Sequence, residues 1–293
     1  MIAAPALSVI IASLSGSAYL DACLAALTQQ EGDIATEIIV AHPSDPAVAD
    51  LVRQKYPAVR LIALPPPRTL AELRAAGLDA ASGDIVALTE DHCVPSPDWF
   101  VLLLALHQAQ PAAAIGGAVD NAATERLVDR FVYAYEYGPF TSPAAHGPVE
   151  VLPGPNVSYK RVALQSLRQV WPQGFDEGRF HRTLRSAGFV LWSEPALRVW
   201  HKKHFTLLAF LRERFHYSRW FAGRRITGPH RLLYLAATPF LPLLLTVRVV
   251  RRRGRVSPWW LFLPFAWLAS WVAAVGEMVG YLSGPGDSAY HLR

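Results

Sequence analysis

The first 110 residues alternate between short apolar runs and stretches in which apolar residues recur every three or four positions. The runs predict β-strands, and the periodic stretches predict amphipathic helices. The expected strands are residues 7–13, 37–41, 59–64 and 84–88, and the expected helices are residues 17–30, 45–56 and 69–81. Because the strands are near-continuous Val/Ile/Leu runs, they are typical of parallel strands covered on both faces. Repeated β-α-β units of this length predict an α/β fold with a doubly wound, mostly parallel sheet.

The pattern changes after residue 110. Residues 111–200 are less regular, with candidate strands at 113–119 and 189–193. Residues 205–225 predict a basic, aromatic and amphipathic helix. Two apolar runs follow, at 232–250 and 258–282, and an arginine-rich loop at 251–255 separates them. The chain is therefore expected to end in a helical membrane region.

The two apolar runs differ in how well they suit a membrane span. The second run has 25 residues and one acid, Glu277, and is long enough to cross a bilayer. The first is interrupted by Pro239 and Pro242 and contains Arg248. We expect an interfacial or re-entrant first segment and an inserted second one, which keeps the loop at 251–255 cytoplasmic. Two simple spans would place that loop outside, against the tendency of Lys/Arg-rich loops.

Charge separates the chain into an acidic front and a basic back. The chain has 293 residues, 52% of them hydrophobic, and a mean hydropathy of +0.20. From Trp200 onward there are 14 Lys/Arg and 3 Asp/Glu, whereas the preceding part has 14 basic and 20 acidic residues. A basic segment favours nucleic acid or an anionic membrane. The apolar runs favour the membrane, so no nucleic-acid partner is expected.

Cysteine usage and the N-terminus bear on location. Cys23 and Cys93 are the only cysteines, which excludes a disulfide framework and a four-cysteine zinc site. The catalytic part is therefore expected to be cytosolic. The opening apolar run lacks a basic leader and continues into a helical pattern, so a buried first strand is favoured over a signal peptide.

Polar residues follow three of the expected strands. In a doubly wound sheet, ligands bind beyond the carboxyl ends of the strands. Ser13, His42 and the loop Glu90–Asp91–His92 all lie at such ends, so we expect them on one edge. Carboxylates there hold a divalent cation or perform acid–base chemistry. Glu90 and His92 are two apart and can face one ion, and the imidazole favours Mn²⁺ over Mg²⁺.

Other interpretations of these features remain open. The acidic loop can be a solvated cap for a helix that begins near Pro97. A dinucleotide site is disfavoured because the first turn, Ser13 to Ser17, has one glycine where that fingerprint needs three. The phosphate-binding pattern GxxxxGK[ST] does not occur in the sequence.

The order of several motifs resembles that of family-2 nucleotide-sugar glycosyltransferases. These motifs are LSVIIAS, EIIVAHPSD, LAELRAAGLDAASGDIVALTEDHCVPSPDWF, GPNVSYKR and GFDEGRFHRTLRSAG, and the resemblance covers about residues 6–205. It implies a GT-A fold, a nucleotide-sugar donor and inversion at the anomeric carbon. It also implies a divalent cation, Mn²⁺ or Mg²⁺, bound with the donor diphosphate.

The resemblance assigns roles to individual residues. Glu90, Asp91 and His92 match the family's DxD metal loop, although Glu90 and His92 replace the usual aspartates. His201 matches a further metal ligand of some members, and a packed or exposed histidine is its alternative. The residues that match the donor site are Ala12, Ser13, His42, Arg74 and Asp91. His42 stands where the family has an aspartate on the base, which puts a uridine donor in doubt.

The resemblance also assigns a base and an acceptor site. Glu177 matches the catalytic base, and Asp176 precedes it. Because Glu177 begins an expected helix, the positive end of that helix favours its ionised form. The alternative for this pair is an ordinary acidic first turn. Asn156 and Trp171 are candidates for the acceptor, although turn chemistry and core packing explain them equally well.

These observations predict a membrane-attached enzyme. We expect a GT-A catalytic domain at residues 1–204, a basic amphipathic linker helix at 205–231 and a membrane region at 232–293. The expected reaction is inverting transfer of a sugar to a lipid-linked or cell-surface glycan acceptor at the cytoplasmic membrane. The alternatives are a non-catalytic membrane protein with a degenerate glycosyltransferase fold and a basic membrane-surface module.

Overall fold

The computed structural model describes residues 5–172, 174–225, 228, 230–252 and 259–292. The chain divides into two compact units. The first contains residues 1–122 and 140–203, and the second contains residues 123–139 and 204–293. The expected arginine-rich loop at 251–255 lies mostly outside the described residues.

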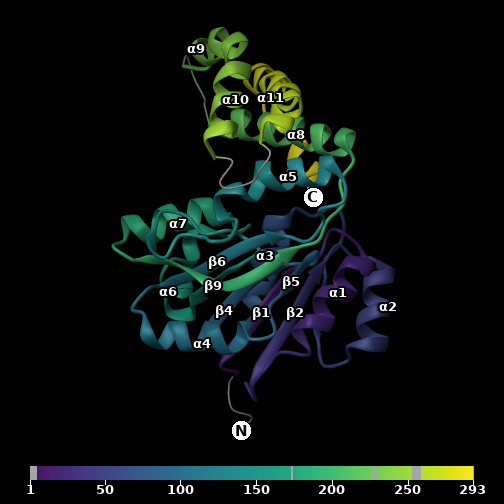
Figure 1. Cartoon of the computed structure of the whole chain (residues 1–293), viewed down its shortest axis with the longest axis vertical. Helices are drawn as coiled ribbons and strands as arrows, with labels where there is room; N and C mark the ends of the chain where they lie inside the picture. The colour runs from purple at the N-terminus through teal and green to yellow at the C-terminus, as the bar shows by residue number, and fades with distance from the viewer. Residues whose placement is uncertain (1–4, 173, 226–227, 229, 253–258, 293) are drawn as a thin grey trace. The chain divides into compact units, whose positions relative to one another are not determined.

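The N-terminal half of the first unit is a parallel β-α-β fold (Figure 1). Its strands are β1 (Leu7–Ala12), β2 (Thr36–His42), β3 (Arg60–Ala63) and β4 (Ile85–Glu90), and its helices are α1 (Ser17–Leu27), α2 (Pro46–Lys55) and α3 (Leu70–Ala80). The four strands pair in parallel in the order β3-β2-β1-β4. With right-handed crossovers, the reversal of direction after β3 places α1 and α2 on one face and α3 on the other. The predicted doubly wound fold is confirmed.

The second half of this unit extends the sheet with mixed strands. The added strands are β5 (Cys93–Pro95), β6 (Ala114–Asn121), β7 (Gly147–Val149), β8 (Val157–Lys160) and β9 (Leu191–His201). β8 is antiparallel to both β4 and β6, and it lies between them in the sheet. The accompanying helices are α4 (Trp99–Ala109), α6 (Arg161–Ser166) and α7 (Glu177–Ser186). The expected strands at 113–119 and 189–193 correspond to β6 and the start of β9.

Two local features fix α3 against the sheet. Thr69 and Glu72 form a capping box, in which each side chain bonds the backbone N–H of the other. Gly77 lies against β1, because a Cβ added there would be 2.3 Å from Ile10 Cγ2. Arg74 lies one turn before Gly77, so this close approach holds its side chain over the sheet.

The second unit is helical. It contains α5 (Leu127–Tyr137), α8 (Leu207–Arg225), α9 (His230–Ala237), α10 (Leu241–Arg252) and α11 (Leu263–Ser283). Phe131 of α5 packs edge-on against Phe210 of α8 and also contacts Phe262. A 3-10 turn at Thr238–Phe240 separates α9 from α10, where Pro239 interrupts the first apolar run.

The C-terminal apolar segments are candidate membrane spans. His230–Arg251 and Trp259–Ser283 are 22 and 25 residues long and apolar enough to cross a membrane, by length and composition. Only 11% of the first window and 39% of the second are buried within the protein.

Candidate active site

The carboxyl ends of β1, β2 and β4 form one edge of the sheet. Ala12 pairs with both Ala41 and Glu90, so the residues that follow these strands are neighbours. Ser13, His42 and Glu90 are all buried there. β4 extends to Glu90, two residues beyond the predicted strand, because Thr89 and Glu90 continue the pairing with β1. Glu90 is therefore held by the sheet, whereas Asp91 and His92 are in the turn that follows.

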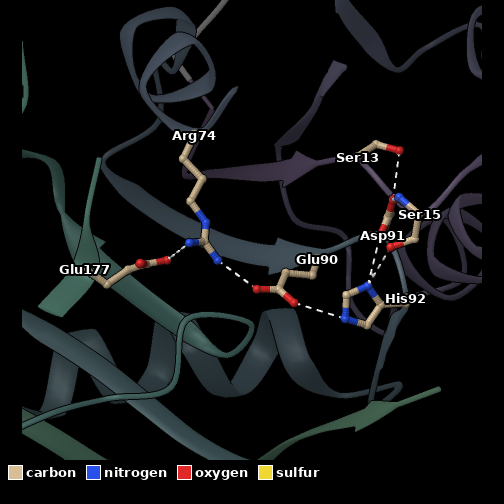
Figure 2. A network of polar contacts seen from close by, with 7 residues as sticks. All are labelled: Ser13, Ser15, Arg74, Glu90, Asp91, His92 and Glu177. Atoms are coloured by element: carbon tan, nitrogen blue, oxygen red, sulfur yellow. Dashed lines mark hydrogen bonds and ion pairs between the residues drawn. The ribbon is translucent and has the colours of Figure 1, made fainter. Parts of the chain in front are cut away.

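Asp91 joins the turn to the first β-α connection (Figure 2). Its Oδ2 accepts hydrogen bonds from Ser13 Oγ at 3.0 Å and from the Ser15 N–H at 2.6 Å. Its Oδ1 lies 2.9 Å from His92 Nδ1. Burial opposes the charged form, but the bonds with His92 and Ser15 outweigh it and lower the pKa of Asp91. Asp91 is thus an ionised carboxylate that orients the loop.

Glu90 and His92 face each other across the turn. Glu90 Oε2 is 3.0 Å from His92 Nε2, and Glu90 Oε1 accepts from Arg74 at 2.8 Å. Burial alone would raise the pKa of Glu90, but His92 and Arg74 hold it well below its usual value. Burial disfavours the imidazolium, yet the bonds with Asp91 and Glu90 raise the pKa of His92. The loop therefore carries two buried carboxylates and a bridging histidine.

Arg74 connects this loop to Glu177. Its Nη1 pairs with Glu177 Oε1 and its Nη2 bonds Glu90 Oε1, so one buried guanidinium contacts two carboxylates (Figure 2). Glu177 is the first residue of α7, and Asp176 is its N-cap, accepting from the Arg179 N–H at 2.6 Å. Burial raises the pKa of Glu177, and the charge of Arg74 offsets part of that rise. A carboxylate with a raised pKa suits a general base.

Side chains of the loop form a possible cation site. Ligand atoms of Glu90, His92 and Cys93 lie within 4.8 Å of one another, and all three residues are buried. The His201 ring lies edge-on to His92, with the ring centres 4.7 Å apart. Glu90 and His92 supply an oxygen and a nitrogen, which fit a divalent cation such as Mn²⁺. Burial raises the pKa of the Cys93 thiol well above its usual value, so its sulfur is the weakest of the three ligands.

Other predicted site residues lie outside the Glu177–Arg74–Glu90 network. His42 is at the same edge, where its Nδ1 accepts from the Asp45 N–H at 3.0 Å, and burial lowers its pKa. Asn156 is fully buried; its amide donates to Ala118 O and Leu197 O and accepts from Trp99 Nε1. The structure thus gives Asn156 a structural role and does not favour its prediction as an acceptor ligand.

Trp171 is likewise part of the core. It is 4% exposed and packs edge-on against Phe175 at a ring distance of 5.6 Å. The guanidinium of Arg168 lies 4.0 Å from its ring centre. A sugar would have to displace Arg168 to stack on that face, so the acceptor prediction for Trp171 is not favoured either.

Three contributing residues were missed by sequence reasoning. Ser15 bonds Asp91, Cys93 supplies a sulfur to the possible cation site, and Gly154 lies against the Arg74–Glu177 pair. A Cβ added to Gly154 would be 2.9 Å from Glu177 Oε1. Cys93 directly follows the acidic loop, and this adjacency was the available signal. Gly154 begins the GPNVSYKR motif, but nothing in the sequence indicated its contact with this pair, which depends on the meeting of α3 and α7.

Comparisons with known proteins agree with this architecture. A family model described as glycosyltransferase like family 2 matches residues 5–223. No curated protein matches the chain in sequence. The mannosyltransferase PcManGT from Pyrobaculum calidifontis, solved in complex with GDP-Man and Mn²⁺, is similar in structure, with a TM-score of 0.50 and 16% identity over 98% of this chain and 78% of that chain. TarS 1–349 from S. aureus gives a TM-score of 0.54 and 12% identity over 95% of this chain and 91% of that chain.

Proposed function

Because the chain belongs to glycosyltransferase family 2, we propose that it is a membrane-attached, metal-dependent and inverting glycosyltransferase. It would transfer a sugar from a nucleotide-sugar donor to a lipid-linked or cell-surface glycan acceptor at the cytoplasmic membrane. The observation that carries the proposal is the continuous polar network from Glu177 through Arg74 and Glu90 to His92 and Asp91. We assign catalysis to the part of the chain before residue 205, with the basic helix and apolar segments as its attachment.

The chemistry follows from where the carboxylates lie. Glu177 would take the proton of the acceptor hydroxyl as that oxygen attacks the anomeric carbon. Attack opposite the leaving group in a single displacement inverts the anomeric configuration. Glu90, His92 and Cys93, with His201 beside them, are the residues that would hold a divalent cation. When bound, such an ion would neutralise charge on the leaving nucleoside diphosphate.

Arg74 has a positioning role in this scheme. It bonds Glu90 on the cation side and Glu177 on the acceptor side, so it sets the separation of the two carboxylates. Ala12, Ser13, His42 and Asp91 lie along the same edge of the sheet and are proposed to contact the donor. The hydroxyls of Ser13 and Ser15 bond Asp91 and His92, so this connection holds the loop in place beside the proposed donor site.

Substitution of the base tests the proposal. Glu177→Gln keeps the size of the side chain but cannot accept a proton, so transfer should fall by about 10²–10⁴-fold. The rise in melting temperature given by nucleoside diphosphate with Mn²⁺ should persist, because donor binding is separate. Asp91→Asn and His92→Ala should lose both transfer and the Mn²⁺-dependent part of that rise.

The controls separate the candidate mechanisms. Near-normal turnover in Glu177→Gln would place the base elsewhere, with Asp176 the next residue to test. Normal turnover of Asp91→Asn and His92→Ala in Mn²⁺ would remove the cation from the mechanism. If the unmodified protein neither hydrolyses nor transfers any nucleotide sugar in Mn²⁺, the non-catalytic alternative is correct.

A further inference from the structure

One side of α11 is an exposed apolar stripe. Trp267, Trp271, Val275, Met278 and Leu282 are between 36% and 55% exposed. Their spacings of four, four, three and four residues place them in one line along the helix. A stripe this regular is a surface that prefers an apolar environment.

The opposite side of α11 packs against α8. A Cβ added to Gly276 would be 2.4 Å from Phe215 O, and one added to Gly280 would be 2.5 Å from Arg219 O. With about 3.6 residues per turn, these glycines are on the other side of α11 from Trp271 and the rest of the stripe. The two helices therefore approach backbone to backbone.

The α8 helix is highly charged along the length that contacts α11. Its 19 residues include six charged side chains, which are Arg212, Glu213, Arg214, Arg219, Arg224 and Arg225. Phe215 is opposite Gly276, Arg219 is opposite Gly280, and the contact continues to Gly223 beside Pro285. The helices thus run side by side in the same direction. If α11 crossed a bilayer in this packing, α8 would enter the hydrocarbon with it.

The energetic cost of placing these charges in hydrocarbon excludes a bilayer crossing by α11 while α8 is packed against it. Each arginine near the centre of a bilayer costs about 2.5–3.5 kcal/mol on insertion scales. Several such charges would outweigh the apolar stripe of one helix. Separating α8 from α11 instead would expose the glycine face of α11 and break the hydrogen bond that Arg219 Nε donates to Gly284 O at 3.3 Å.

The first apolar segment lies along another side of α11 and runs antiparallel to it. Arg231 donates to Leu282 O at 2.9 Å, and Thr246 bonds Ser270 at 3.0 Å. Its most exposed apolar side chains add to the exposed apolar area of the unit. These are Leu232, Leu233, Phe240, Leu243 and Leu244, between 52% and 75% exposed. We call these residues, together with the α11 stripe, the membrane face.

We infer that the second unit docks in the plane of one leaflet of an anionic membrane, and that neither apolar segment crosses the bilayer. The inference rests on the membrane attachment in the proposed function and specifies how the helices lie in the membrane. The membrane face enters the boundary between headgroups and acyl chains, as amphipathic in-plane helices do. Since α8 is on the opposite side of α11, its charges stay in water or among the headgroups.

Positive charge on the unit fits an anionic partner. Arg224 and Arg225 at the end of α8 lie 5.2 and 5.1 Å from the ring centres of Trp220 and Phe221. Aromatic rings and arginine side chains are both typical of the interfacial layer of a membrane. There the apolar stem of an arginine contacts lipid while its charged guanidinium stays in water. Anionic headgroups attract such residues.

Cysteine labelling in intact cells tests the topology. Trp260→Cys and Tyr290→Cys place thiols at exposed positions just before and just after α11, at residues 59% and 45% exposed. Cys23 and Cys93 are buried and give a low background. We expect the protein in the membrane fraction. An impermeant maleimide should label neither variant in intact cells and both after the cells are permeabilised. Asp50→Cys, in the exposed part of α2, is the control for a cytoplasmic thiol.

The possible outcomes separate this inference from the proposed function. Labelling of Trp260→Cys in intact cells would show that both segments cross and would overturn the in-plane arrangement alone. Labelling of Tyr290→Cys would show that α11 crosses by itself, with the same consequence. Recovery of the unmodified protein entirely in the soluble fraction would overturn both the membrane attachment and its geometry, while donor hydrolysis would still test the enzyme.

Discussion

Arg74 is the residue on which the two halves of the site depend. It is 5% exposed and contacts carboxylates from β4 and α7, which are 87 positions apart in sequence at Glu90 and Glu177. Removing Arg74 would leave Glu177 as a buried carboxylate without this compensating charge, which is strongly destabilising. The charge of Arg74 also offsets part of the rise that burial causes in the pKa of Glu177.

His107 is a buried histidine outside the active site, and it makes the stability of the fold depend on pH. Ser158 Oγ donates its proton to Ile115 O at 3.0 Å, so His107 Nε2, at 2.8 Å, must be the donor to Ser158. His107 Nδ1 is buried with no acceptor for a second proton, which favours the neutral ring. Burial, helped by the charge of Lys160, lowers its pKa from 6.5 to about 3.

The lowered pKa of His107 predicts that the folded protein loses stability in acid. Between pH 6.5 and about 3 the unfolded chain binds a proton at His107 and the folded chain does not. Stability is then complete above pH 6.5 and falls by about 1.4 kcal/mol per pH unit below it. His107→Gln, which keeps an N–H donor, should flatten the decline of the melting temperature from pH 7 to 5. His230→Gln, at an exposed position, should not; equal slopes in all three proteins would contradict the assignment.

The sequence could identify strand-end residues of the site but not their partners. Ser13, His42 and Glu90 follow apolar runs, and a parallel sheet brings such positions together wherever the strands pair. The bonds of Ser15 to Asp91 and of Arg74 to Glu177 depend on the conformations of loops and on helix packing. Asn156 and Trp171 show the reverse case, because residue types that suit sugar binding are used here by the core.

At the scale of elements, the position of α3 is set by one glycine. Gly77 allows α3 to approach β1 until only the Ile10 side chain separates them, and Arg74 is carried on the same side of the helix. A larger residue must push the helix outward or displace Ile10. Either change moves the guanidinium relative to Glu90, so packing of this helix controls the geometry of the site.

Gly77→Ala should therefore affect stability and donor binding together. Overpacking of this kind costs about 1–3 kcal/mol, and we expect weaker thermal stabilisation by nucleoside diphosphate. Ile10→Ala removes the atom that the new Cβ would meet, at 2.3 Å. In a double-mutant cycle of unfolding free energies, the pair should be less destabilising than the sum of the single changes. Strict additivity would show that Ile10 does not limit the approach of α3.

The regular elements were predictable where one periodicity dominated. β1 to β4 and α1 to α3 follow the apolar pattern to within a few residues, because their burial is set by their own βα units. β8 was not predicted as a strand, since its insertion between β4 and β6 is a tertiary event. The α5 helix was also missed: its aromatic and β-branched residues suit a strand equally well, and packing of Phe131 against Phe210 favours the helix.

At the scale of the whole molecule, the uneven charge along the chain has a physical consequence. From Trp200 onward the chain has 14 Lys/Arg and 3 Asp/Glu, and this is also where the membrane face occurs. Apolar burial provides attachment that salt does not weaken, whereas the arginines add attraction that salt screens within about 8–10 Å at physiological ionic strength. Membrane binding should therefore combine a salt-resistant and a salt-sensitive part.

The arginines at the end of α8 allow these parts to be separated. Each Lys/Arg near an anionic surface contributes about 1 kcal/mol, so Arg224→Gln/Arg225→Gln should weaken binding to vesicles containing anionic phosphatidylglycerol by roughly thirtyfold. In 0.5 M salt the difference from the unmodified protein should largely disappear, because screening removes the attraction in both. Arg53→Gln/Lys55→Gln is the matched control, since it removes two exposed charges from α2 in the first unit. Flotation of the three proteins with anionic and zwitterionic vesicles measures the effect. If the α8 and α2 pairs weaken binding equally, net charge rather than the position of these arginines governs attachment, and α8 does not lie at the headgroups.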